Sequence, residues 1–130
     1  MGGILTPTLT ILIADHHEDV LNILEKQLAT TNYALLHARN GAKAIALLER
    51  LKSKIELAII DLELPDFSGF DLIGRLTLHD RKPLKIIATT SIHPQPVLEK
   101  IREMGVDAVV KKPISTEEWR RTLETVIEGT

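Results

Sequence analysis

The sequence contains no cysteine, no long apolar run and no excess of basic residues. Without cysteine there is no disulfide and no thiolate metal site, which is typical of the cytoplasm, so we expect a cytoplasmic location. No apolar run approaches the roughly 20 residues that span a bilayer, so we expect no membrane association. The formal net charge of -2 provides no global basic field, which argues against direct nucleic-acid binding.

What remains is the composition of one globular domain. The 130 residues are 44% hydrophobic and 26% charged, which allows a substantial core but not two domains. Residues 1–7 are uncharged and too short for a signal peptide. We therefore expect a flexible N-terminal lead at residues 1–7 and a single domain over residues 8–130.

Apolar runs and helical stripes alternate along the chain. Strands are predicted at residues 9–14, 33–38, 55–60, 84–90 and 108–110. Apolar residues at helical spacing follow each of them, within residues 18–30, 44–51, 72–76, 97–104 and 119–127. Gly105 is a natural helix C-cap, and Ser115 with Glu118 forms a capping-box pair. This alternation predicts an α/β fold, a doubly wound five-stranded parallel sheet with helices on both faces.

Reactive side chains stand where these strands end. Asp61 follows the run at residues 55–60, which reads as a strand buried on both faces, and ligand sites of such sheets lie at the carboxyl ends. Asp15 and His16 follow the first strand, Thr90 ends the fourth and Lys112 follows the fifth.

This set of groups suits phosphoryl chemistry. Two neighbouring carboxylates repel unless they are protonated or bridged by a cation, and a few oxygen ligands suit Mg²⁺. A hydroxyl and an ammonium opposite them would hold phosphoryl oxygens. The implied reaction is attack of the Asp61 carboxylate on a phosphoryl donor, which gives an acyl phosphate.

Four motifs carry a resemblance to a known family. They are Asp15 after LTILIA, the D-x-x-x-P-x-x-x-G spacing of Asp61, Pro65 and Gly69, Thr90 after KIIAT, and Lys112-Pro113 after AVVK. In this order they resemble the receiver domain of bacterial two-component response regulators. The phrase HARNGAKAIALLE also resembles the family's second strand and helix.

The resemblance implies a flavodoxin-like fold with strand order 2-1-3-4-5 and a signalling domain rather than an enzyme, with at most weak autodephosphorylation. Asp61 would be the phosphoacceptor. Mg²⁺, with Mn²⁺ as the other option, would bind weakly to Asp15, Asp61 and the backbone carbonyl of Glu63. Thr90 and Lys112 would bind the phosphoryl group, and the bond before Pro113 would be cis.

The resemblance also implies partners. The donor would be a histidine kinase or a phosphotransfer protein. An output partner, or a fused output domain, would be contacted through the fourth and fifth helices. The sequence does not decide whether the chain forms a homodimer, which pathway it serves, or whether it is part of a longer protein.

Three positions depart from the family pattern. His16 stands where a second acid is usual; a solvated loop residue is the simpler reading, and a ligand for Mn²⁺ or Zn²⁺ is the other. Val109 stands where the family has an aromatic residue that swings inward during switching. Glu63 would reach over the site, either repelling a donor or positioning the hydrolytic water. His17, by contrast, is expected in the first helical turn.

Two rival functions follow from these departures. One is a pseudo-receiver, an interaction module that keeps the fold without productive phosphorylation, and His16 and Val109 favour it. The other is a flavin- or nucleotide-binding enzyme on the same fold. That enzyme would need a glycine- or hydroxyl-rich phosphate loop after the first strand, where this chain has DHHED.

Overall fold

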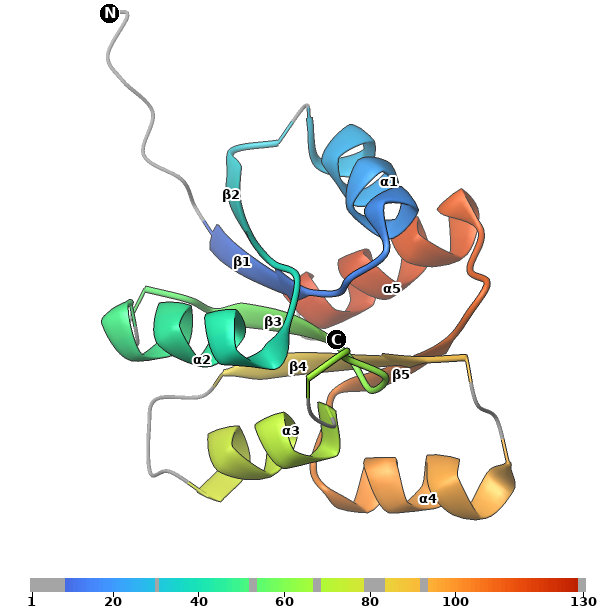
Figure 1. Cartoon of the computed structure of the whole chain (residues 1–130). Helices are drawn as coiled ribbons and strands as arrows, with labels where there is room; N and C mark the ends of the chain where they lie inside the picture. The colour runs from blue at the N-terminus through green and yellow to red at the C-terminus, as the bar shows by residue number, and fades with distance from the viewer. Residues whose placement is uncertain are drawn as a thin grey trace, which may run out of the picture.

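A computed structural model describes residues 9–29, 31–51, 54–66, 69–78, 84–91 and 94–128, so the lead predicted at residues 1–7 lies outside it. Within these ranges strands and helices alternate along the chain (Figure 1). The elements are β1 (Leu9–Ala14), α1 (Glu18–Leu28), β2 (Tyr33–Ala38), α2 (Gly41–Arg50), β3 (Leu57–Asp61), α3 (Gly69–Leu78), β4 (Lys85–Thr90), α4 (Gln95–Glu103), β5 (Ala108–Lys111) and α5 (Thr116–Glu128).

The strands form one parallel sheet in the order β2-β1-β3-β4-β5, which confirms the predicted doubly wound topology. Figure 1 shows α1 and α5 on one face of the sheet and α2, α3 and α4 on the other. In the central pair, Asp61 of β3 lies beside Thr89 of β4. The carboxyl ends of β1, β3, β4 and β5 therefore meet at one edge of the sheet.

Strand alternation divides the core into two layers. Within β3, which is buried at every position, Ile59 packs with the residues of α1 and α5 while Ile60 packs with those of α2, α3 and α4. Trp119 of α5 is fully buried in the first layer. With both faces covered, β3 is held rigidly, and so is the position of Asp61 at its end.

Two of the predicted helix ends are found in the structure, and the predicted start of the first helix needs a correction. Gly105 follows α4 with φ 86°, a conformation that favours glycine, and the Ser115 hydroxyl accepts the Glu118 N–H at 3.1 Å at the start of α5. The assignment of His17 to the first helical turn was wrong. His17 is the N-cap of α1 with an extended backbone, φ -92° and ψ 120°, and its side chain makes no capping hydrogen bond to the helix.

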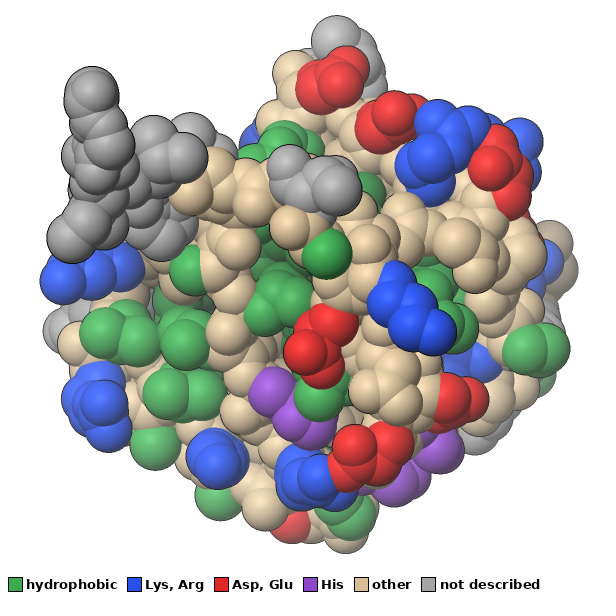
Figure 2. Space-filling model, turned by 90° about the horizontal axis from the view of Figure 1, so that it is seen from above, with side chains coloured by type: hydrophobic (Ala, Val, Ile, Leu, Met, Phe, Trp, Pro, Cys, Tyr) green, Lys and Arg blue, Asp and Glu red, His purple; other side chains and the backbone are tan. Residues whose placement is uncertain are grey.

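One face of the molecule carries charges of both signs. Viewed from the side of α1 and α5, acidic and basic side chains are interspersed (Figure 2). On α5, for example, Arg120 pairs with Glu117 and with Glu124. Among the described residues, no helix is both long and apolar enough to span a membrane.

Candidate functional site

Asp15 and Asp61 are the two buried carboxylates at the carboxyl edge of the sheet, with exposed fractions of 1% and 0%. Each accepts a backbone N–H from the residue two positions later. The His17 N–H donates to Asp15 Oδ1 at 2.8 Å, and the Glu63 N–H donates to Asp61 Oδ1 at 2.9 Å. One oxygen of each carboxylate is thereby anchored by the chain, and the other, Oδ2, faces the site.

Lys112 supplies the cation opposite these oxygens. Its Nζ lies 2.8 Å from Asp15 Oδ2 and 3.4 Å from Asp61 Oδ2, and its side chain is 11% exposed. The Lys112 N–H donates to the Thr90 carbonyl at 2.7 Å, which fixes the chain beyond β5, and the Lys112–Pro113 bond is cis. Lys111, the neighbouring lysine at the end of β5, is exposed.

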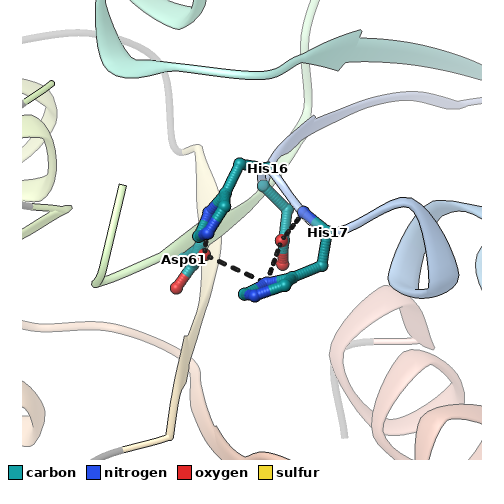
Figure 3. Close-up of side chains that lie close together, drawn as sticks. His16, His17 and Asp61 are labelled. Atoms are coloured by element: carbon teal, nitrogen blue, oxygen red, sulfur yellow. Dashed lines mark hydrogen bonds and ion pairs between the residues drawn. The ribbon is translucent and has the colours of Figure 1, made fainter. Parts of the chain in front are cut away.

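Two histidine rings lie beside the Asp61 carboxylate, as Figure 3 shows. His16 Nδ1 lies 3.3 Å from Asp61 Oδ2, and His17 Nδ1 lies 3.1 Å from Asp15 Oδ1 and 3.9 Å from Asp61 Oδ2. The ring centroids are 3.9 Å apart. We call Asp15, His16, His17 and Asp61 the histidine–aspartate cluster. Sequence reasoning missed His17, although two adjacent histidines directly after Asp15 are a signal that could have found it.

Burial raises the pKa of Asp61 above its ordinary value. The negative charges of Asp15 and Glu63 raise it further, whereas the Glu63 N–H and the Lys112 ammonium oppose the rise. Asp61 Oδ2 is buried and accepts no hydrogen bond from the described residues. Asp61 Oδ2 therefore has the Lys112 ammonium nearby but no hydrogen bond, and it is suited to bind an electrophile or a cation.

On the far side of Asp61, the Glu63 carboxylate binds the end of β4. The Thr90 hydroxyl donates to Glu63 Oε2 at 2.7 Å, and the Ser91 N–H and hydroxyl both donate to Glu63 Oε1 at 2.9 Å. Glu63 therefore does reach across the site, and its anionic oxygens take up the donors at the end of this strand. Thr89, one residue earlier, is buried inside the strand.

Val109 lies on β5 among partly buried residues that pack against the layer of α2, α3 and α4. A hollow of ≈ 300 Å³ opens on the other side of the site, beside His17 and Lys112. Its apolar wall comes from α1, from the segment that leads into α5 and from α5 itself, and consists of Val20, Ile23, Pro113, Ile114 and Trp119.

Comparison with known proteins decides the family. The profile of the response regulator receiver domain matches residues 11–124 of this chain. The chain belongs to this family. Receiver domains are signalling domains, and the acidic site described above lies at the edge of the sheet where the sequence motifs predicted it.

Individual relatives agree with this assignment. The chain is 30% identical over 106 residues to the response regulator GtcR of Aneurinibacillus migulanus, covering 82% of this chain and 42% of GtcR. It is 24% identical to the polar-differentiation response regulator DivK of Brucella anthropi over 91% of this chain and 95% of DivK. The non-phosphorylated HemR receiver domain from Leptospira biflexa superposes with a TM-score of 0.85 at 25% identity, over 95% and 97% of the two chains.

The residues present fit a divalent cation of the kind the family implies. Asp15 and Asp61 are two carboxylates directed at one point, and Asp61 Oδ2 has no hydrogen bond from the described residues to satisfy it there. Hard oxygen ligands of this kind suit Mg²⁺ or Mn²⁺. The neighbouring imidazoles suit Mn²⁺ better than Mg²⁺.

Proposed function

We propose that this receiver domain, residues 8–130, accepts a phosphoryl group on Asp61 from a histidine kinase or a phosphotransfer protein in the cytoplasm. An Asp61 oxygen would attack phosphorus and form a P–O bond while the P–N bond to the donor histidine breaks. The product is an acyl phosphate on Asp61. The domain then signals through an altered surface that includes α4 and α5.

One observation carries this proposal. Asp61 Oδ2 is buried, accepts no hydrogen bond from the described residues and lies 3.4 Å from the Lys112 ammonium. A nucleophile without a competing hydrogen bond, beside a fixed positive charge, suits a reaction that brings negative charge to this point.

The neighbouring residues receive the following roles. Lys112 pairs with the bound phosphoryl group, and Thr90 binds it once Glu63 gives up the Thr90 hydroxyl. Asp15, Asp61 and the Glu63 carbonyl are the ligands of a divalent cation, which when bound supplies charge against the phosphoryl oxygens. The apolar hollow beside His17 and Lys112 gives the phosphoryl donor a surface next to Asp61.

The test is labelling with acetyl phosphate in the presence of Mg²⁺ or Mn²⁺, followed by intact-protein mass measurement. We expect the mass of one phosphoryl group on the wild-type chain and none on Asp61→Asn. An established receiver domain, labelled in parallel, controls for the reagent. An unchanged mass with both metals, while the control is labelled, would refute the assignment of Asp61.

A second candidate is a pseudo-receiver that works without phosphorylation. The bond from Thr90 to Glu63 favours it, because the hydroxyl assigned to the phosphoryl group already has an anionic partner. Under this alternative, Asp61→Asn would leave partner binding by α4 and α5 unchanged. The proposed flavin- or nucleotide-binding enzyme receives no support from the family assignment.

A further inference from the structure

We propose that the histidine–aspartate cluster is a zinc-class site, which binds Zn²⁺ through two imidazoles and two carboxylates in preference to Mg²⁺. His16 and His17 each contribute Nδ1, and Asp15 and Asp61 each contribute one carboxylate oxygen. These four ligand atoms lie within 4.8 Å of one another. Mg²⁺ selects oxygen ligands, whereas imidazole together with carboxylate is a common donor set for Zn²⁺.

Two distances between ligand atoms match four-coordinate zinc. Zinc bonds to nitrogen and oxygen are about 2.0–2.1 Å long, so neighbouring ligands of a tetrahedral ion lie about 3.3 Å apart. His16 Nδ1 and Asp61 Oδ2 are 3.3 Å apart, and His17 Nδ1 lies 3.1 Å from Asp15 Oδ1. His17 Nδ1 lies 3.9 Å from Asp61 Oδ2, so these two atoms would have to move closer together to bind one tetrahedral ion.

A buried atom points independently to a ligand at this place. Asp61 Oδ2 is aimed into the cluster, belongs to a fully buried side chain and accepts no hydrogen bond from the described residues. A buried carboxylate oxygen without a hydrogen bond costs free energy that a coordinated cation would offset.

Lys112 marks the place where a cation is stable. Its Nζ lies 2.8 Å from Asp15 Oδ2, 3.2 Å from His17 Nδ1 and 3.4 Å from Asp61 Oδ2. The ammonium therefore contacts three of the four residues that would bind zinc. It would compete with a metal ion, so removing it should strengthen zinc binding.

The test is calorimetric titration of the full chain, freed of metal with a chelator, with zinc chloride and separately with magnesium chloride. We expect one Zn²⁺ per chain, bound at least about 100-fold more tightly than Mg²⁺. Zinc should also shift the imidazole nitrogen resonances of His16 and His17. Co²⁺ in place of zinc should give the intense visible absorption of a four-coordinate ion.

Three variants separate ligation from a structural role. The double variant His16→Gln/His17→Gln should lose at least about 10-fold in zinc affinity and keep its magnesium affinity. His37→Gln is the matched control, because the His37 ring contacts the Asp15 backbone carbonyl at 2.9 Å and does not belong to the cluster. It should bind zinc like the wild type. Lys112→Met should bind zinc more tightly than the wild type.

Absence of zinc binding would overturn the proposal. So would a double variant with wild-type zinc affinity, or one that loses zinc and magnesium affinity equally, since equal losses indicate a damaged fold. Thermal unfolding of each variant checks the fold directly. Zinc binding does not require Asp61 to be phosphorylated, so a failed labelling experiment would leave this site standing.

Discussion

The Thr90 hydroxyl donates a hydrogen bond to Glu63 Oε2 at 2.7 Å, across the mouth of the site above Asp61. The same carboxylate accepts two hydrogen bonds from Ser91. The Glu63 carboxylate thus accepts a hydrogen bond from the Thr90 hydroxyl, which we assign as a donor to the phosphoryl group. Glu63 and the phosphoryl group would therefore compete for Thr90.

This competition predicts the effect of Glu63→Gln. The substitution removes a negative charge close to Asp61 and weakens the bonds that hold Thr90 and Ser91. We expect acetyl phosphate to label the variant about 5-fold faster than the wild type, corresponding to roughly 1 kcal/mol of screened repulsion. Glu103→Gln, which removes an exposed acid from α4, should label at the wild-type rate. Slower labelling of Glu63→Gln would indicate that Glu63 assists the reaction instead.

The Asp61 carboxylate is expected to limit stability. Because the folded state raises the pKa of Asp61, this state holds its proton more strongly than the unfolded chain does. Stability is therefore lost as pH rises from the ordinary aspartate pKa through the raised folded value, at about 1.4 kcal/mol for each unit of the rise. Asp61→Asn has no charge to desolvate, and its side-chain oxygen can still accept the Glu63 N–H.

Thermal unfolding of the metal-free proteins from pH 3 to pH 8 measures this difference. We expect the Asp61→Asn variant to melt at a higher temperature at neutral pH, with an advantage that shrinks as the pH falls. An advantage that is equal at all pH values would point to a cause other than ionisation of Asp61.

Gly69 is predicted to be intolerant of any side chain. A Cβ at this position would lie 2.4 Å from the Asp61 carbonyl oxygen and 2.6 Å from Leu62 Cα, and neither backbone atom can yield easily. We expect Gly69→Ala to lower the free energy of unfolding by about 2–3 kcal/mol. Denaturant unfolding measures this value.

The same helix provides the control. A Cβ added to Gly74 of α3 would meet no atom of the described residues within 4 Å, so Gly74→Ala should raise stability by about 0.5–1 kcal/mol through helix propensity. If both variants lost the same stability, the cause would be α3 as a whole and not the close approach of Gly69 to the strand that carries Asp61.

Sequence patterns predicted the doubly wound parallel sheet and the residues at the strand ends, because buried parallel strands have a distinctive apolar composition and emerge at one edge. The order of the strands was predicted from the resemblance to receiver domains, and the structure has that order. The patterns could not predict where side chains turn after a strand ends. Asp66, for example, accepts the backbone N–H groups of Gly41 and Ala42 and so caps α2 from a distant loop. The position of the His17 ring was missed for the same reason, because the torsions of the loop after β1, and not a regular repeat, set the direction of this side chain.

Zinc should inhibit phosphorylation, because Asp61 Oδ2 is at once a proposed zinc ligand and an oxygen of the proposed nucleophile. With free zinc at about ten times its dissociation constant, and Mg²⁺ present, labelling by acetyl phosphate should slow about tenfold, since only the zinc-free chain reacts. The double variant His16→Gln/His17→Gln binds zinc at least about 10-fold more weakly, so its labelling should slow no more than about twofold at that concentration. Equal inhibition of both proteins would indicate that zinc acts on acetyl phosphate and not on the histidine–aspartate cluster. Undiminished labelling of a wild-type chain that calorimetry shows to be zinc-bound would mean that zinc leaves the Asp61 oxygen free to react.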